Sequence, residues 1–428
     1  MPPLIIEGNF VDIEGVNRGR VIIGDDGIIA RVESVTGQAD IVLNDELIFP
    51  GFIDLHVHAR ECADHAWDYK EDFTTAGEAA INGGVAAFAD MPNNPVPPVD
   101  EKSYADKYQL AKKSVVDVLL YAGVGPATRP FECSAPIYGL QPINRRATRR
   151  VPYKVFMSQS VGDLFFKTRD ELSFALEKYR GQHVSFHCED PEVLEKAKSS
   201  ATHELRRPPQ AETLAIDFAL ALIKKYRLQG KICHCSTEEG LRKIISAKQA
   251  GLPVTVEVTP HHLFFDSSSV GNGRDHSLQV NPPIRQSPQN RLALVAALKN
   301  GDIDYLATDH APHTIEEKEK GVSGLPHLDT YGPFVTWLMA EHGFSPADVA
   351  RVCSFYPGKF FSEFSEIKYG QIAPGFVGSL TVLDMNRPTT ITKSILKTKC
   401  GWSPFEGVTF PGRVAMTIIK GRIFKNSI

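Results

Sequence analysis

Eight short apolar segments alternate with stretches of helical spacing through the middle of this chain. Apolar residues recur at helical intervals in stretches such as AETLAIDFALALIKKY and TEEGLRKIISAKQAG. Strands that alternate with helices form βαβ units, and eight such units close into a barrel. The sequence therefore predicts an α/β fold, a (β/α)8 TIM barrel. The predicted strands lie at residues 52–59, 86–91, 118–124, 153–157, 184–189, 231–236, 254–259 and 304–309.

The two ends of the chain carry a different pattern. Both contain short strand-like runs, such as RVIIGDDG near the start and GSLTVLDM near the end, separated by Gly, Pro and Asp. Strands without intervening helices favour an antiparallel sheet or sandwich. We expect residues 1–49 and 366–428 to form one small β-sandwich domain, and residues 50–365 to form the barrel.

Composition and charge exclude several classes of protein. With 42% hydrophobic and 23% charged residues in 428, the chain can bury a large core, which argues against disorder. No apolar run approaches the roughly 20 residues of a membrane span, and the start lacks a secretory pattern. A net charge of −4 gives no reason to expect nucleic acid as a partner. Seven cysteines without framework spacing favour a reducing compartment, so a cytoplasmic location is expected.

Ionisable residues stand near the ends of the predicted strands, where the active site of such a barrel lies. His56 and His58 are two residues apart and therefore share one face of the first strand. A single buried histidine is usually a hydrogen-bonded core residue, but several that converge favour a metal, because imidazole and carboxylate are ordinary zinc ligands. The predicted ligands are His56, His58, His187, His234 and Asp309.

Lys154 lies in the fourth predicted strand. A lone lysine more often reaches to the surface, but a buried one is costly as a cation. Reaction with carbon dioxide would convert its amine into a carbamate, an anionic oxygen ligand able to bridge two divalent ions. We therefore add Lys154 to the candidate ligands.

Further polar residues follow the same strands. They are Arg60, Asn93, Asn281 and His313. Arginine and asparagine suit recognition of a carboxylate through charge-assisted hydrogen bonds. Any one of them could have a purely structural role in a loop. Together, at one end of the barrel, they favour substrate binding.

Cys233 and Cys235 flank His234. Side chains alternate along a strand, so both cysteines are expected to point away from the face of His234. We interpret them as core residues rather than metal ligands.

Together, the segments GFIDLHVHARE, DMPNN, YKVFM, SFHCED, ICHCST, EVTPHHL, VNPPIR and ATDHAPHT resemble the dihydroorotases of the amidohydrolase superfamily. The lysine segment is similar to the carboxylated-lysine type, which includes archaeal members. The resemblance spans nearly the whole chain. It implies a zinc-dependent enzyme of pyrimidine biosynthesis that interconverts N-carbamoyl-L-aspartate and L-dihydroorotate.

The resemblance also implies roles for the candidate residues. One zinc ion would be held by His56, His58 and Asp309, and a second by His187 and His234. Lys154, as a carbamate, would bridge the two ions. Arg60, Asn93 and His313 would bind the α-carboxylate of the substrate, with Asn281 as a further contact, and Asp309 would act as general base and acid. A homo-oligomer, such as a dimer, is expected, whereas association with aspartate transcarbamoylase has no readable signal.

The chain departs from the family pattern on the substrate side. In the stretch 323–333, His327 stands where glycine is common and Asp329 where glutamate is common. A later asparagine-proline motif is replaced by FYPGKFF. None of these changes touches a predicted metal ligand.

Two other interpretations remain open. One is a different cyclic amidohydrolase, such as a hydantoinase, dihydropyrimidinase or allantoinase, which shares the histidines and the lysine but generally lacks the combined Arg60, Asn93 and His313 set. The other is a non-catalytic scaffold relative that keeps the barrel and loses ligands. Every expected ligand type is present here.

Overall fold

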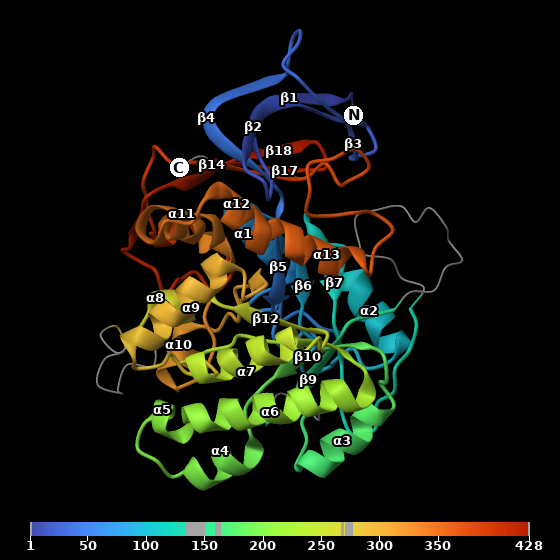
Figure 1. Cartoon of the computed structure of the whole chain (residues 1–428), viewed down its shortest axis with the longest axis vertical. Helices are drawn as coiled ribbons and strands as arrows, with labels where there is room; N and C mark the ends of the chain where they lie inside the picture. Colours follow the sequence, from blue (N-terminus) through green and yellow to red (C-terminus); the bar gives the residue numbers. More distant parts are fainter. Residues whose placement is uncertain (1, 134–149, 159–163, 267–268, 270–276, 427–428) are drawn as a thin grey trace.

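The computed structural model describes residues 2–133, 150–158, 164–266, 269 and 277–426. Residues 144–149 of the basic segment NRRATRR (144–150) and residues 159–163, which follow the lysine segment, fall outside the described residues. The described chain forms a barrel and, at the top of Figure 1, a sheet built from both ends of the chain.

The barrel contains all eight predicted strands, with the third divided in two. Sheet β5-β6-β7 and sheet β8-β9-β10-β11-β12-β13 are parallel throughout. Strands β7 and β8 are separated only by Tyr121. A parallel bridge between Val57 and His310 joins the first strand to the segment that follows the last strand, which closes the barrel. The strands are β5 (Phe52–Val57), β6 (Val85–Asp90), β7 (Asp117–Leu120), β8 (Ala122–Gly123), β9 (Tyr153–Phe156), β10 (His183–His187), β11 (Gln229–Ile232), β12 (Val254–Val258) and β13 (Tyr305–Leu306).

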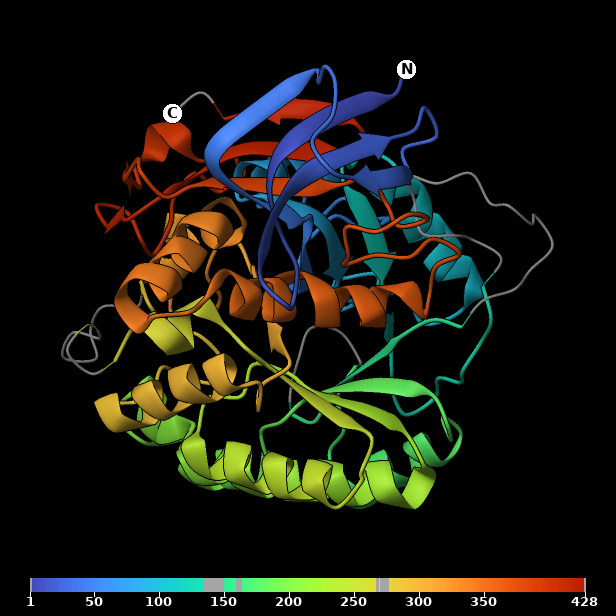
Figure 2. The same cartoon turned by 45° about the horizontal axis from the view of Figure 1, so that its top comes forward.

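Helices lie outside these strands, as Figure 2 shows. Side chains of Asp72, Asp100, Thr168 and Thr237 accept hydrogen bonds from the first turns of four of them, which defines where each helix begins. The α-helices are α1 (Phe73–Asn82), α2 (Glu101–Ala111), α3 (Arg169–Glu177), α4 (Pro191–Ala197), α5 (His203–Arg206), α6 (Pro209–Tyr226), α7 (Glu238–Gln249), α8 (Pro260–Phe264), α9 (Pro288–Asn300), α10 (Ile315–Glu319), α11 (Tyr331–His342), α12 (Pro346–Ala350) and α13 (Tyr356–Ser362).

The terminal strands form one seven-stranded sheet, in the order β18-β17-β14-β4-β1-β2-β3. Its buried core combines Ile29 of β3 with Met416 of β17, so the sheet curls until its two ends share one core. The strands are β1 (Leu4–Val11), β2 (Val16–Ile23), β3 (Ile29–Glu33), β4 (Ile41–Pro50), β14 (Leu380–Asp384), β17 (Arg413–Ile419) and β18 (Arg422–Lys425). The barrel and the sheet-rich domain made from both termini are thus confirmed.

The segment between β14 and β17 reaches away from this sheet. It contains the short pair β15 (Thr389–Thr390) and β16 (Thr409–Phe410). Trp402, Phe405 and Phe410 are buried in the same core as the barrel side chains, although the predicted division assigns them to the terminal domain. The division at residues 49/50 and 365/366 stays a prediction.

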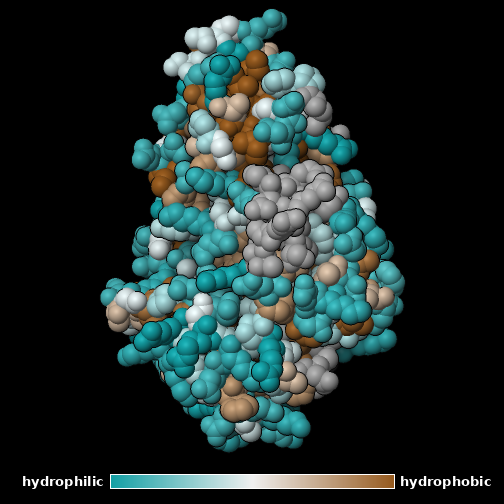
Figure 3. Space-filling view, turned by 90° about the vertical axis from the view of Figure 1, so that its right-hand side faces the viewer, coloured by the Kyte–Doolittle hydropathy of each residue, from teal (hydrophilic) through white to brown (hydrophobic). Residues whose placement is uncertain are grey.

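The terminal sheet exposes apolar side chains. The end of the molecule that carries the terminal sheet shows apolar surface among hydrophilic side chains in Figure 3. Ile13, Val16, Val32, Val35 and Val42 are exposed in this part of the chain. Among the helices of the described residues, none combines the length and apolar character needed to cross a membrane.

Phe405 should be a major anchor of the carboxy-terminal segment, because it is 0% exposed and its ring lies 5.3 Å from that of Phe265. Phe405→Ala is expected to reduce the free energy of unfolding by about 3–5 kcal/mol, measured by denaturant titration. Phe174, which is 69% exposed on α3, provides the control. Phe174→Ala should change the free energy of unfolding by less than about 0.5 kcal/mol. Equal effects of the two variants would contradict this assignment.

Candidate active site

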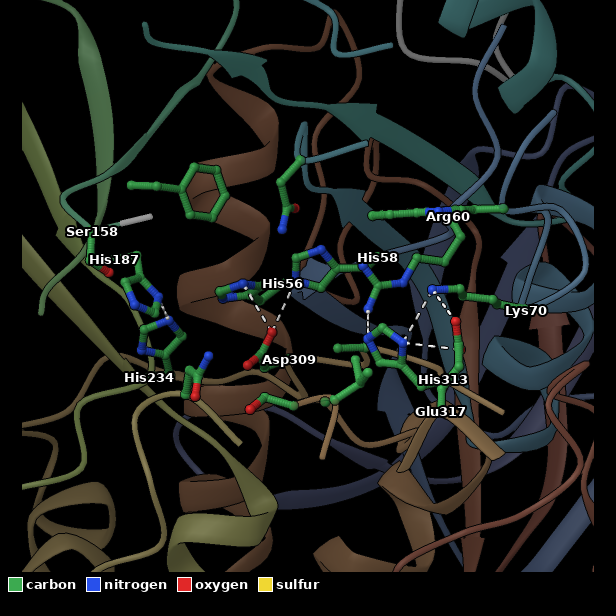
Figure 4. Close-up of a pocket in the computed structure, with 18 of the residues that line it drawn as sticks. His56, His58, Arg60, Lys70, Ser158, His187, His234, Asp309, His313 and Glu317 are labelled. Atoms are coloured by element: carbon green, nitrogen blue, oxygen red, sulfur yellow. Dashed lines mark hydrogen bonds and ion pairs between the residues drawn. The ribbon is translucent and has the colours of Figure 1, made fainter. Parts of the chain in front are cut away.

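A cavity of about 570 Å³ lies at the carboxyl ends of the barrel strands. Figure 4 shows side chains from distant segments pointing into it. Nine of the ten predicted site residues line it, namely His56, His58, Arg60, Asn93, His187, His234, Asn281, Asp309 and His313. Lys154 is 0% exposed and lies at the inner side of this group.

The first donor group joins the first and last barrel strands. His56 and His58 project from β5 and the residue after its end, on the same face, as the strand alternation predicts. Their Nε2 atoms lie 3.2 and 3.0 Å from the same oxygen of Asp309, Oδ1. Asp309 follows β13 with a φ of 48°, a left-handed conformation that redirects the chain at this point.

The second donor group consists of His187 and His234. His187 ends β10, and His234 lies two residues after β11. His187 Nδ1 and His234 Nε2 face each other at 2.9 Å. The rings of His234 and His56 are 5.3 Å apart, so the two groups are adjacent. Single donor atoms of His56, His234 and Asp309 all lie within 4.8 Å of one another.

The protonation of these histidines suits a metal. Burial lowers the pKa of His56 to about 4 and holds the pKa values of His58 and His234 well below the usual value. The positive charge of the Lys154 amine lowers all three pKa values further. The neutral imidazoles of His56, His58 and His234 offer lone pairs, and together with His187 and Asp309 they form a set of nitrogen and oxygen donors that fits one or more divalent cations.

Cys233 corrects one prediction. Its Sγ lies 2.8 Å from Lys154 Nζ and therefore borders the site rather than pointing away from it. Strand β11 ends at Ile232 and His234 has a φ of 35°, so strand alternation does not extend this far. Burial raises the pKa of Cys233 to about 11, which keeps the thiol neutral. Cys235 is buried in the core, as predicted.

Positive charge gathers at the opposite end of the cavity. Arg60 Nη2 lies 3.0 Å from His313 Nε2, and Lys70 Nζ lies 2.8 Å from Glu317. Burial and the charges of Arg60 and Lys70 hold the pKa of His313 far below its usual value, so this ring is neutral. Two cations and one carboxylate leave an excess of one positive charge, which complements an anionic group on a ligand.

The two asparagines present unsatisfied atoms. Asn93 Oδ1 and Asn281 Oδ1 are buried and lack a hydrogen-bond partner among the described residues. Buried polar atoms rarely remain unpaired unless a ligand or water completes them. Both side chains line the cavity, which is consistent with contacts to a bound molecule.

The two departures in the 323–333 stretch do not line the cavity. His327 stacks on His261 with ring centroids 5.1 Å apart, and its Nε2 lies 3.0 Å from His261 Nδ1. Asp329 accepts hydrogen bonds from Asn82 and from the backbone of Lys397 and Thr398. They therefore affect how this loop and the carboxy-terminal segment pack, while Ser323 and Gly324 face the cavity.

Sequence reasoning missed several residues of the site. Trp67, Lys70, Arg207 and Glu317 line the cavity from loops and α10, where no strand pattern marks them. Glu257 and Lys231 lie inside the barrel beneath the donor groups. Glu257 could have been found, because it is an ionisable residue within a strand, VTVEV, that is otherwise mostly apolar. Lys231 lies in the strand QGKI, where no such contrast marks it.

The sequence profile of the amidohydrolase family matches residues 47–424, and the chain belongs to this family. Among its relatives are dihydroorotases. That of Pyrococcus furiosus is 33% identical over 98% of this chain and 92% of its own length, and that of Bacillus licheniformis is 31% identical over 99% and 98%. The resemblance found in the sequence is thus confirmed.

Solved structures share the fold. The L-hydantoinase (dihydropyrimidinase) of Arthrobacter aurescens superposes with a TM-score of 0.87 at 23% identity, covering 100% of this chain and 96% of that one. A dihydropyrimidinase from Brevibacillus agri gives a TM-score of 0.82 at 21% identity, covering 99% and 95%. At this level of identity the similarity shows the architecture alone.

His187→Ala should weaken divalent-metal binding, because it removes one of two facing nitrogens. The metal bound per chain should fall, and the metal-dependent rise in melting temperature should shrink, with affinity at least about tenfold weaker. Elemental analysis and thermal melts measure both. His342→Ala, at the end of α11, is the control and should bind metal like the wild type. Unchanged metal content in His187→Ala would contradict the assignment.

Proposed function

We propose that this chain catalyses the reversible interconversion of N-carbamoyl-L-aspartate and L-dihydroorotate, a step of pyrimidine biosynthesis. One observation carries the proposal: a buried Arg60–His313 pair lies in the same cavity as the metal-donor histidines. Such a cavity suits a small cyclic amide that also bears a carboxylate. Dihydroorotases that are 30–33% identical over nearly the whole chain support it.

We propose two zinc ions as the resident metal. His56, His58 and Asp309 would hold one, His187 and His234 the other, and Lys154 as a carbamate would bridge them. Lys154 supports this arrangement because it is fully buried and its Nζ lies 2.8 Å from Sγ of Cys233, the residue before His234. When bound, the ions supply a water nucleophile at neutral pH and polarise an amide carbonyl.

Side chains of the cavity would bind the substrate and transfer the proton. Arg60, with Asn93 and the neutral His313, would bind the carboxylate of the substrate and thereby orient its ring, and Asn281 would add a hydrogen bond. Asp309 would accept a proton from the attacking water and return it to the leaving amide nitrogen. Lys70 and Glu317 would hold His313 in place.

The alternatives differ in what they require. A hydantoinase or dihydropyrimidinase shares the barrel and metal donors, but the excess positive charge beside Arg60 favours a substrate with a carboxylate. A scaffold relative has no need of the full donor set, which is present here. A homodimer and a cytoplasmic location stay predictions, and association with aspartate transcarbamoylase stays open.

The purified protein, supplied with zinc and bicarbonate, should be assayed with dihydroorotate, hydantoin, dihydrouracil and allantoin. Turnover of dihydroorotate is expected, because it alone among the four carries a carboxylate on its ring beside the amide. Turnover of hydantoin but not dihydroorotate would refute the proposal in favour of a hydantoinase. Absence of turnover with all four, together with less than one zinc per chain, would favour the scaffold.

Asp309→Asn should lower kcat by roughly 10²- to 10⁴-fold, because an amide cannot carry the proton between water and leaving group. Steady-state assays with dihydroorotate measure this, with zinc content determined in parallel. Asp302→Asn, in the loop before β13, should leave kcat unchanged. A metal-loaded Asp309→Asn variant that retains wild-type kcat would remove Asp309 from the proton transfer.

A further inference from the structure

A buried ion pair lies inside the barrel beneath the donor groups. Lys231 of β11 and Glu257 of β12, on neighbouring strands, are 1% and 0% exposed, and Lys231 Nζ lies 2.6 Å from Glu257 Oε2. The same ammonium donates a hydrogen bond to the carbonyl of Leu55, 3.3 Å away. Buried charge pairs are costly compared with apolar packing, so stability alone gives a weak reason for one here.

The other oxygen of Glu257 faces the donor groups. Oε1 forms a short hydrogen bond with His56 Nδ1 and accepts one from the backbone N–H of His234 at 3.1 Å. With its proton fixed on Nδ1, His56 keeps the lone pair of Nε2 directed toward Asp309 and the cavity. His234 has a φ of 35°, which residues with a Cβ rarely adopt, and the bond to its N–H holds that turn. One oxygen atom thus contacts a residue of each donor group.

A carboxylate suits this place better than an amide. Glu257 receives three donors, and an amide in the same position would turn its own N–H groups toward one of them. All three partners, the Lys231 ammonium, the His56 ring N–H and the His234 backbone N–H, donate to Glu257, so the position suits a group whose two oxygens only accept.

The second donor group has a comparable but narrower support. Glu189 Oε2 lies 2.8 Å from His187 Nε2 and forms an ion pair with Arg207. This carboxylate reaches a side chain of one donor group only. Glu189 is therefore a matched control for Glu257 within the same chain.

We propose that Glu257, anchored by Lys231, is a positioning residue that fixes the tautomer of His56 and the backbone of His234 and so sets the divalent-ion affinity of both donor groups together. This inference rests on the metal centre of the proposed function. It concerns groups that do not touch the substrate. Hydrogen bonds to metal-binding imidazoles typically change metal affinity by about 10- to 100-fold.

Zinc binding to the metal-free protein, measured by competition with a chromogenic chelator, tests the role. Glu257→Gln should weaken both binding steps by about 10- to 100-fold, whereas Glu189→Gln should weaken one step. The visible absorption of the cobalt-substituted protein should change in Glu257→Gln, because the ligand geometry of both groups shifts. Two zinc affinities within twofold of wild type, with an unchanged cobalt spectrum, would overturn the proposal.

Glu257→Gln leaves Lys231 without a carboxylate, so circular dichroism and melting of the metal-free forms must accompany the titration. If this variant does not fold, Lys231→Met/Glu257→Gln removes both charges while the amide oxygen can still face His56. The double variant should fold and bind zinc more weakly than wild type. Wild-type affinities in it, or failure to fold, would assign the pair a purely structural role.

Different results would contradict the proposed function and the role of Glu257. A wild-type chain that binds zinc but does not turn over dihydroorotate contradicts that function, while the affinities of the variants still decide the role of Glu257. A wild-type chain that binds no divalent ion overturns both.

Discussion

Closure of the barrel between its first and last strands is the contact on which the site depends. The backbone N–H of His58 donates to the carbonyl of His310 at 2.8 Å, next to the bridge between Val57 and His310. The hydroxyl of Thr308 donates to the buried carboxyl of Asp54 at the same seam. These bonds bring β5 alongside the residues after β13, about 250 positions later, so that His56 and His58 meet Asp309.

Desolvation then determines the chemistry of the cavity. At one end the imidazoles of His56, His58 and His234 are neutral, because burial lowers their pKa values. Cations outnumber carboxylates at the other end, around His313. A single cavity therefore presents lone pairs to a metal on one side and positive charge to an anionic group on the other. Such a division of charge suits a small anionic ligand, which it can orient.

The carboxy-terminal segment contributes to the site although it leaves the barrel pattern behind. The indole N–H of Trp402 donates to the carbonyl of His313 at 2.7 Å, and Asp329 binds the backbone of residues 397–398. The departures at His327 and Asp329 lie in this packing rather than on the cavity wall. The unusual loop therefore leaves the nine predicted residues that line the cavity in place.

Periodicity in the sequence was sufficient to predict the eight strands, because side-chain alternation is a local property. The end of the barrel at which His56, His58, His187 and His234 gather followed from their places near the carboxyl ends of those strands. Lys70 and Glu317 could not be placed in this way, since they come from a loop and a short helix whose position depends on long-range packing. Cys233 was misplaced because the turn at His234 interrupts the strand. The sequence by itself thus determined which residue types stand at the strand ends. Only the tertiary structure decided which of them touch, because the distances between side chains on separate strands and loops follow from how the barrel closes.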